Sequence, residues 1–378
     1  MQPIRLPVLY CEVMIMAGTD RPKKASRGWL KVLLTILVVM LGLILLVLLA
    51  VTIYWNAMLN KINRMDETVA ATLSEAEIQE IMDEVNDPDA EDTTYPTDPL
   101  VTDEEDYIAN GDTILNIMLL GQDIRTKGTN RRGRTDTMIL CTINTEAKTI
   151  TFTSFLRDIY VKLPDFDGKQ WGYNRLNANY VFGGAEMLDQ CMQMNFGIDP
   201  EYFVVVDFDA FIEVIDLLGG VEIELTDTEA WYLNLGVPSW RLKGGLRRLT
   251  GEQAAAYAQI REIDGNFQRS VRHRNLLNSL MVKFKQMSPT QLHQMLSTAL
   301  PYVTTDMTND EITKYALMLI PMVGELEVRN FRIPIDGSYY HANKGTAEKP
   351  RSVLAVDLEA NREALRQFLG DDALSKAG

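Results

Sequence analysis

The chain has 378 residues, of which 46% are hydrophobic and 24% charged, a composition that excludes disorder of the whole chain. Its formal net charge of −15 disfavours nucleic acid as a partner, because duplex affinity depends on cationic contacts to phosphate. Three cysteines and three histidines lie far apart, which excludes a disulfide framework and a histidine-rich metal centre. Any metal is therefore expected to have oxygen ligands.

The first predicted element is a transmembrane helix over residues 29–55. Residues 32–54 contain no charged side chain, and these 23 residues are enough to cross a hydrocarbon core of about 30 Å. Trp29 and Trp55 stand at its two ends, as interfacial aromatic residues do. Basic side chains precede the span, so the positive-inside rule predicts a cytoplasmic tail at residues 1–28 and an extracellular location for the rest.

Residues 56–111 are predicted to form an acidic extracellular stalk. Between residues 60 and 112 the sequence holds 17 acidic and two basic side chains, so this stretch alone accounts for the net charge of the chain. Ser74 and Glu77 have the spacing of a capping box before a short helix. Prolines with acidic neighbours follow, which is typical of a solvated linker. We interpret the stretch as a monomeric spacer, with a short coiled-coil dimer as the alternative.

A globular domain is predicted from residue 112 to about residue 369, and its pattern is α/β. Strands are expected at residues 114–120, 137–143, 149–155, 202–208, 221–225 and 328–333. Helices are expected at residues 185–194, 209–218, 251–261, 272–286 and 354–369. Together they predict a central mixed, largely antiparallel sheet flanked by helices on both faces.

Charged side chains gather at the ends of the first three predicted strands. Short links join these strands into an antiparallel meander, in which the end of the first, the start of the second and the end of the third share one edge. The residues at that edge are Asp123, Arg125, Arg134, Asp136, Arg157 and Asp158. Carboxylates on strand ends suit Mg²⁺, and guanidinium groups bind phosphate oxygens in pairs. The pattern predicts a diphosphate held between Mg²⁺ and arginines, with an inert ion-pair network as the alternative.

A second cationic group follows the predicted helix that ends near Arg261. Arg269 and Arg272 are three residues apart, and Arg269 and His273 are four apart, so a helix would place them on one face. A solvated basic helix face is the alternative, and we expect it for Arg274.

Seven strings in this order resemble the LytR-CpsA-Psr family of Gram-positive cell envelopes. They are NIMLLGQDIR, RGRTDTMIL, SFLRDIYV, RLNANYVFGG, VDFDAFIEVIDLLGGVEI, LTGEQAAAYAQIR and DGNFQRSVRHRNLL. The resemblance covers residues 112–290 and identifies them as the catalytic domain. Residues 291–378 would then form the C-terminal part of the extracellular domain.

The resemblance implies a membrane-anchored, Mg²⁺-dependent phosphotransferase. Members of the family move a glycopolymer, such as a teichoic acid or a capsular polysaccharide, from an undecaprenyl diphosphate carrier to peptidoglycan. A non-catalytic envelope regulator or sensor is one alternative. A polyprenyl diphosphate pyrophosphatase, which would use water as the acceptor at the same site, is another.

The resemblance also assigns roles to the residues of the two charged groups. Asp123 and Asp136 match the magnesium-binding aspartates of the family. The residues that match its diphosphate-contacting arginines are Arg125, Arg157, Arg261 and Arg269. Arg134 and Arg272 stand in the same motifs as further candidates for diphosphate binding. Two positions depart from the family pattern: Gln259 stands where many members have arginine, and His273 where glutamine is frequent.

Overall fold

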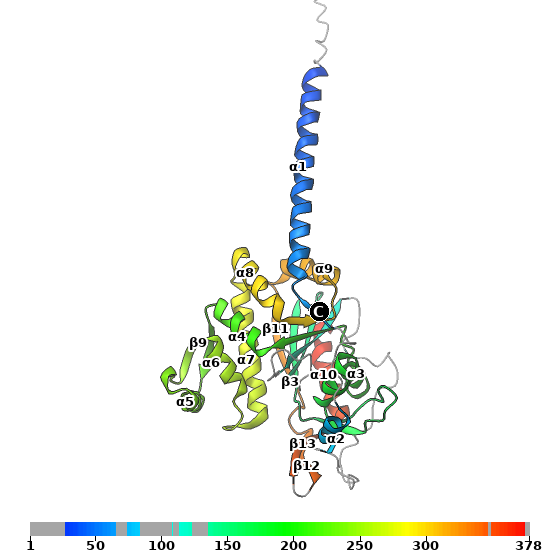
Figure 1. Cartoon of the computed structure of the whole chain (residues 1–378), viewed down its shortest axis with the longest axis vertical. Coiled ribbons are helices and arrows are strands. Elements are labelled where there is room, and N and C mark those ends of the chain that lie inside the picture. The colour runs from blue at the N-terminus through cyan, green and yellow to red at the C-terminus, as the bar shows by residue number, and fades with distance from the viewer. Residues whose placement is uncertain are drawn as a thin grey trace, which may run out of the picture. The chain divides into compact units, whose positions relative to one another are not determined.

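The chain divides into two compact units, residues 1–55 and residues 56–378 (Figure 1). The computed structural model describes residues 27–65, 74–83, 108, 113–122, 135–346 and 349–374.

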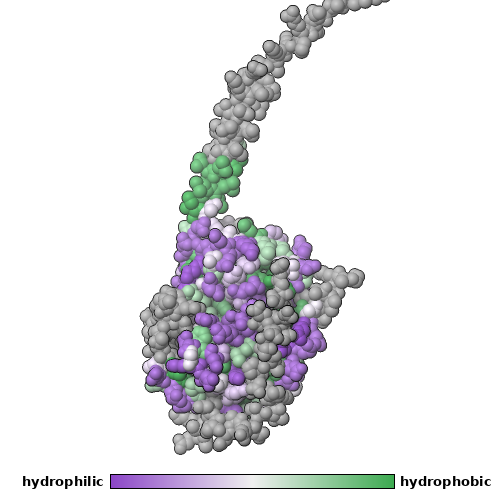
Figure 2. All heavy atoms as spheres, turned by 90° about the vertical axis from the view of Figure 1, so that its right-hand side faces the viewer, coloured by the Kyte–Doolittle hydropathy of each residue, from purple (hydrophilic) through white to green (hydrophobic). Residues whose placement is uncertain are grey.

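The described part begins with helix α1 (Arg27–Leu59), which carries the predicted span over residues 29–55. From Ile44 to Tyr54 its large apolar side chains are exposed, and this stretch is green in Figure 2. Among the residues that the structure describes, no helix is long and apolar enough to cross a membrane. Most side chains before Ile44 lie outside the described ones, so the span stays a prediction from the sequence.

Parts of the predicted stalk pack into the second unit. Met58, Leu59 and Ile62 are buried, and Met82 of helix α2 (Glu75–Asp83) contacts the main core. The hydroxyl of Ser74 accepts a hydrogen bond from the N–H of residue 77, whose carboxylate accepts from residue 74 in return, which confirms the capping box. The periodic apolar side chains of these described segments thus have partners in the second unit, and the proline-containing part of the predicted linker lies outside the described residues.

A seven-stranded mixed sheet forms the centre of the second unit, with the strand order β1-β10-β7-β2-β3-β4-β11. Its strands are β1 (Asn63–Arg64), β2 (Ile114–Gln122), β3 (Thr135–Asn144), β4 (Thr149–Phe155), β7 (Tyr202–Asp207), β10 (Val303–Thr305) and β11 (Glu327–Ile333). Strands β2, β3 and β4 form the predicted antiparallel meander. Antiparallel pairs are not the majority of strand pairs in the described sheet, however, so the sheet is mixed but not largely antiparallel. Strands β7 and β11 follow helical crossovers and pair in parallel with β2 and β4.

Helices cover both faces of this sheet. The helices are α3 (Ala178–Phe196), α4 (Phe208–Leu217), α5 (Asp227–Gly236), α6 (Gly251–Gln259), α7 (Gly265–Lys285), α8 (Pro289–Ala299), α9 (Asn309–Leu319) and α10 (Leu358–Leu374). On β3, Met138 and Leu140 share a core with α3 and α10, whereas Ile139 and Cys141 face α7 and α9. This alternation is the period of two expected for a strand that is buried on both faces.

A smaller lobe has its own apolar core. Helices α4, α5 and α6 pack there with the ribbon of β8 (Val221–Leu225) and β9 (Gly245–Leu249). Strand β8 was expected in the central sheet, and the structure places it in this lobe instead. Two further ribbons are formed by β5 (Tyr160–Lys162) with β6 (Tyr173–Arg175) and by β12 (Tyr339–Thr346) with β13 (Lys349–Val356).

Two predicted helix boundaries also differ from the structure. Helix α7 begins at Gly265, before the expected residue 272, and the polar side chains of Arg269 and Arg272 in its first two turns have partners elsewhere in the folded protein. Gly265 itself has a φ of +80°, a conformation that glycine adopts without strain. Leu354 belongs to β13, and the last helix begins at Leu358.

Candidate functional site

Three arginines meet at Asp136, the second residue of β3. Arg157 donates to the Oδ1 atom of its carboxylate, and Arg261 donates to the Oδ2 atom at 2.6 Å. Arg269 donates to the backbone carbonyl of Asp136 at 3.3 Å. Arg157 follows β4, Arg261 follows α6, and Arg269 lies in α7, so residues from three separate parts of the chain meet at this edge of the sheet. The predicted meeting of Asp136 and Arg157 at one sheet edge is confirmed.

Three of the predicted site residues, Asp123, Arg125 and Arg134, lie outside the described residues. The last residue of β2, Gln122, pairs with Thr135 at the start of β3. The connection that carries these three residues therefore begins and ends beside Asp136.

Burial and charge act in opposite directions on the pKa of Asp136. Desolvation alone would raise this pKa, but the arginines, Arg157 foremost, hold it below its ordinary value. Asp136 is therefore ionised at neutral pH.

Arg269 is a buried cation in a repulsive environment. It is 4% exposed, and burial first, then the charges of Arg157 and Arg261, lower its pKa to about 10. Its Nη1 atom finds no hydrogen-bond partner among the described residues. A buried guanidinium with an unused donor is stabilised by an anion that reaches it.

A carboxylate on the far side of Arg157 adds to the network. Asp158 is 8% exposed, and its Oδ1 atom lies 3.5 Å from Nε of Arg157 and 3.4 Å from Nε of Arg175. Sequence reasoning did not single out Arg175, although it stands in the string RLNANYVFGG. Among the described residues, four guanidinium groups (Arg157, Arg175, Arg261 and Arg269) lie at two carboxylates (Asp136 and Asp158), which gives this part of the site an excess of positive charge.

A small pocket opens onto three of these groups, those of Asp136, Arg157 and Arg269. Its lining includes Asp136, Thr137, Ser154, Arg157, Arg269, Ser270 and His273. The Oγ atom of Ser154 is buried and has no hydrogen-bond partner in the described part of the chain. Cationic and hydroxyl donors thus line a concave surface, which is the chemistry of a phosphate-binding site.

His273 is a neutral link between three elements of the site. Its Nε2 atom lies 3.1 Å from the carbonyl of Ala258, which only accepts, so Nε2 carries the proton. Nδ1 then accepts from the hydroxyl of Thr137 at 3.2 Å. Burial foremost, with the charge of Arg269, lowers the pKa of His273 to about 4. The ring therefore ties α7 to α6 and β3 without adding charge.

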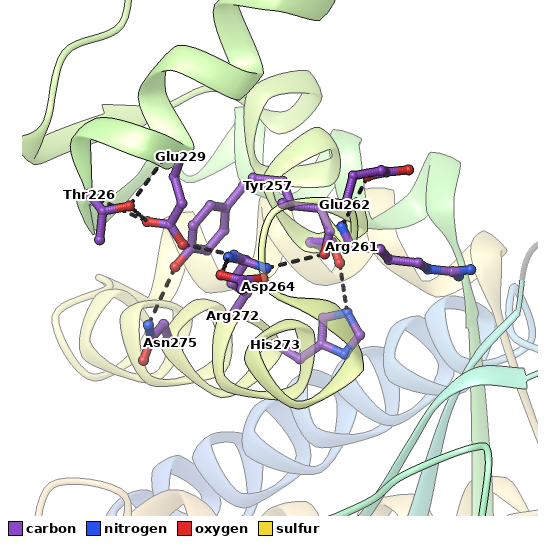
Figure 3. Close-up of polar contacts among 11 residues, drawn as sticks. Thr226, Glu229, Tyr257, Arg261, Glu262, Asp264, Arg272, His273 and Asn275 are labelled. Atoms are coloured by element: carbon purple, nitrogen blue, oxygen red, sulfur yellow. Dashed lines mark hydrogen bonds and ion pairs between the residues drawn. The ribbon is translucent and has the colours of Figure 1, made fainter. Parts of the chain in front are cut away.

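Arg272 was predicted to contact the diphosphate, but its guanidinium points elsewhere (Figure 3). It is 2% exposed and donates to the carboxylate of Glu229 at 2.7 Å, to that of Asp264, and to the carbonyl of Ile260 at 3.2 Å. Three residues along a helix correspond to a rotation of about 300°, which directs Arg269 to β3 and Arg272 to the smaller lobe. Arg272 therefore holds α5 and the loop after α6 against α7.

The described residues supply one of the two predicted magnesium ligands. Asp136 has the hard oxygen donors that Mg²⁺ prefers, and each of its oxygens already accepts from an arginine. Within the ranges that the structure describes, no group of three or more His, Cys, Asp or Glu side chains has the arrangement of a metal site. The second predicted ligand, Asp123, lies outside the described residues, so the magnesium site stays a prediction from the sequence.

The family model described as the LytR_cpsA_psr family matches residues 72–355. The chain belongs to this family. The regulatory protein MsrR of Staphylococcus aureus (strain COL) is 30% identical over 262 residues, which are 68% of this chain and 75% of MsrR. The polyisoprenyl-teichoic acid–peptidoglycan teichoic acid transferase TagU of Enterococcus faecalis is 29% identical over 205 residues, 53% of this chain and 64% of TagU.

A solved structure has the same fold. The LytR-CPS2A-psr family protein YwtF (TagT) of Bacillus subtilis, with bound octaprenyl pyrophosphate lipid, superposes with a TM-score of 0.51 at 20% identity. The match covers 73% of this chain and 96% of that one. The likeness bears out the α/β fold with a central mixed sheet between helices.

Proposed function

We propose that this protein is a membrane-anchored phosphotransferase that moves a glycopolymer from undecaprenyl diphosphate to peptidoglycan. The polymer would be of the teichoic acid or capsular polysaccharide type. The observation that carries the proposal is the convergence of Arg157, Arg261 and Arg269 on Asp136. Among the described residues, these groups have an excess of positive charge and a buried N–H group without a hydrogen-bond partner. The name of TagU and the octaprenyl pyrophosphate bound by YwtF support the same chemistry here.

The chain's own residues would act by binding and by charge. Arg157, Arg261 and Arg269 would hold the diphosphate oxygens and neutralise the charge that develops on the leaving prenyl phosphate. The acceptor hydroxyl would attack the glycan-side phosphorus. Its new O–P bond would replace the bond to prenyl phosphate, and the hydroxyl proton would pass to solvent. Because the guanidinium groups are fixed by Asp136 and Asp158, little reorganisation would accompany the step.

Asp123 and Asp136 are the residues that we propose hold Mg²⁺. When bound, this ion would supply further neutralisation of the diphosphate charge.

We further propose that the helix at residues 29–55 anchors the protein in the cell membrane. Residues 1–28 would be cytoplasmic, and the site would face the peptidoglycan. The donor diphosphate and the anchor would then share one membrane, which is what a lipid-linked donor requires.

A non-catalytic regulator is the second candidate, and the name of MsrR favours it. Such a protein would bind the lipid diphosphate at the same arginines without turnover. A pyrophosphatase would differ from the proposed phosphotransferase only in the acceptor, since water would replace the sugar hydroxyl.

The test is a transfer assay with the full chain in detergent. A prenyl-diphosphate-linked oligosaccharide and peptidoglycan fragments are supplied with Mg²⁺ or with EDTA. Formation of a glycan–peptidoglycan phosphodiester only with Mg²⁺ is the expected result. Asp136→Asn and Arg157→Gln should abolish it, whereas Arg248→Gln, at an exposed position of β9, should not. Prenyl phosphate released without the linkage would establish the pyrophosphatase, and tight lipid binding without turnover would establish the regulator.

A further inference from the structure

A second pair of arginines lies on the opposite side of α7 from the smaller lobe. They are Arg274 of α7 and Arg332 of β11, and burial foremost, then the charge of Arg332, lowers the pKa of Arg274. Arg332 pairs with the exposed carboxylate of Asp336. Arg274 donates to the Oγ atom of Ser270 at 2.9 Å, and no carboxylate among the described residues pairs with it. Within the described part of the chain, two partly buried guanidinium groups and one exposed carboxylate leave a positive charge uncompensated.

This pair adjoins the pocket that contains Asp136. Ser270, to which Arg274 donates, lines that pocket. Arg332 is the parallel cross-strand partner of Ser154, which also lines it. Paired residues of neighbouring strands point to the same face of a sheet, so Arg332 and Ser154 share the α7 face. Each of the two arginines is therefore next to a residue that lines the pocket of Asp136, Arg274 through Ser270 and Arg332 through Ser154.

Aromatic rings continue the same surface. The Cζ atom of Arg332 lies 4.7 Å from the ring centroid of Phe267, in the first turn of α7. Phe267 stacks on Tyr339 of β12, with ring centroids 4.8 Å apart and an interplanar angle of 29°. Both rings are partly exposed. The guanidinium group of Arg332 and the ring of Tyr339 therefore cover the two faces of Phe267, and this stack holds Arg332 in place beside the pocket.

We propose that Arg274 and Arg332 form a second anion subsite, which binds a phosphate or carboxylate on the sugar units next to the reacting diphosphate. The stacked rings of Phe267 and Tyr339 would keep Arg332 in position to bind this group. The inference rests on the proposed transferase function, which it extends to the charge of the glycan. The anion has two possible sources, a phosphodiester within the donor polymer and a carboxylate of the peptidoglycan acceptor.

The experiment compares charged and neutral substrates on the full chain. Two prenyl-diphosphate donors are used, one with a neutral oligosaccharide and one with a phosphodiester between its sugars. Two acceptors are used, peptidoglycan fragments with free and with amidated carboxylates. Arg274→Gln and Arg332→Gln are compared with the unaltered protein, with Arg274→Lys, which keeps the charge, and with the exposed control Arg248→Gln.

Each glutamine variant is expected to raise the KM for the charged substrate by about tenfold, the effect of losing one charge-assisted contact, with little change in kcat. The matching neutral substrate should show no such rise, and Arg274→Lys should retain most of the affinity. An effect that follows the donor phosphodiester assigns the anion to the donor, and one that follows the free carboxylates assigns it to the acceptor. An equal effect on charged and neutral substrates, or none on either, would overturn the subsite.

Equilibrium binding separates this inference from the proposed function. The ratio of Kd values for the charged and neutral substrate is measured for the same variants without turnover. If the unaltered protein transfers nothing, the transferase proposal fails, and the binding ratio still decides the subsite. If the glutamine variants leave this ratio of Kd values unchanged, the second anion subsite is refuted.

Discussion

Two buried arginines of α7 are expected to respond in opposite ways to the same substitution. Arg272 is 2% exposed and forms ion pairs with Glu229 and Asp264. Arg269 is 4% exposed, donates to a backbone carbonyl, and lies among other arginines. Replacing each by methionine, which keeps much of the apolar stem, separates a cation that holds the fold from one that serves the site.

The ion pairs of Arg272 determine how much unfolding free energy Arg272→Met is expected to lose. Glu229 is 7% exposed and would lose its cationic partner. Removing one member of a buried ion pair costs about 3–5 kcal/mol of unfolding free energy, which lowers the Tm by roughly 10 °C in a domain of this size. Glu229→Gln combined with Arg272→Met should recover part of the loss, because a neutral amide is cheaper to bury.

The expected change in unfolding free energy has the opposite sign for Arg269→Met. A folded-state pKa of about 10, below the ordinary range of arginine, means that the protonated side chain opposes folding at neutral pH. Removing it should leave the unfolding free energy within about 1 kcal/mol of its original value or raise it. Transfer should nevertheless be lost, since the buried donor for the diphosphate is gone.

Thermal unfolding of the full chain in detergent, followed by near-ultraviolet circular dichroism, measures both effects. Transfer is assayed below the lower transition temperature. Equal losses of Tm in the two variants, or a larger loss for Arg269→Met, would refute the division of roles between the two arginines.

Three further outcomes are expected. Asp136→Asn should lower the transfer rate by at least about a hundredfold. Because the pKa of Asp136 is lowered, the contribution of its carboxylate to transfer should persist from neutral pH into the acid range. It should disappear as the pH falls through that lowered pKa. His273→Gln should keep the transfer rate within about threefold, because the amide can accept from Thr137 and donate to Ala258. The ring of His273, whose pKa is about 4, should be neutral in the unaltered protein. An inflection of the rate near pH 6.5 that His273→Gln abolishes would contradict this neutral ring. Gln259→Arg, at an exposed position, should raise the rate by up to about tenfold if the cation frequent in the family contributes, and an unchanged rate would show that it does not.

Sequence reasoning was sufficient where the chain order itself imposes geometry. Short links between the first three strands predict an antiparallel meander, and a meander places the start of β3 and the end of β4 at one edge. The contact between Asp136 and Arg157 follows from that topology alone. The strings of the family motifs added Arg261 and Arg269, which local pattern does not connect with β3.

The sequence was insufficient where a side chain's partner comes from a distant element. Arg269 and Arg272 belong to one motif and one helix, and they differ only in what packs against each side of α7. The polar start of that helix has no apolar period, so its first turns became visible only when the folded protein supplied their contacts. Arg274 was expected in solvent, and the structure places it partly buried beside Arg332.

The sequence by itself determined the strands of the meander, the family, and the convergence of a carboxylate with arginines at one sheet edge. Hydrophobic period and link length are local properties, and they are sufficient for these conclusions. Only the tertiary structure decided which arginine serves the site, which one holds the lobe, and that a second cationic pair lies beside the first. Those assignments depend on burial and on charges brought close by folding, neither of which is encoded in the spacing of residues along the chain.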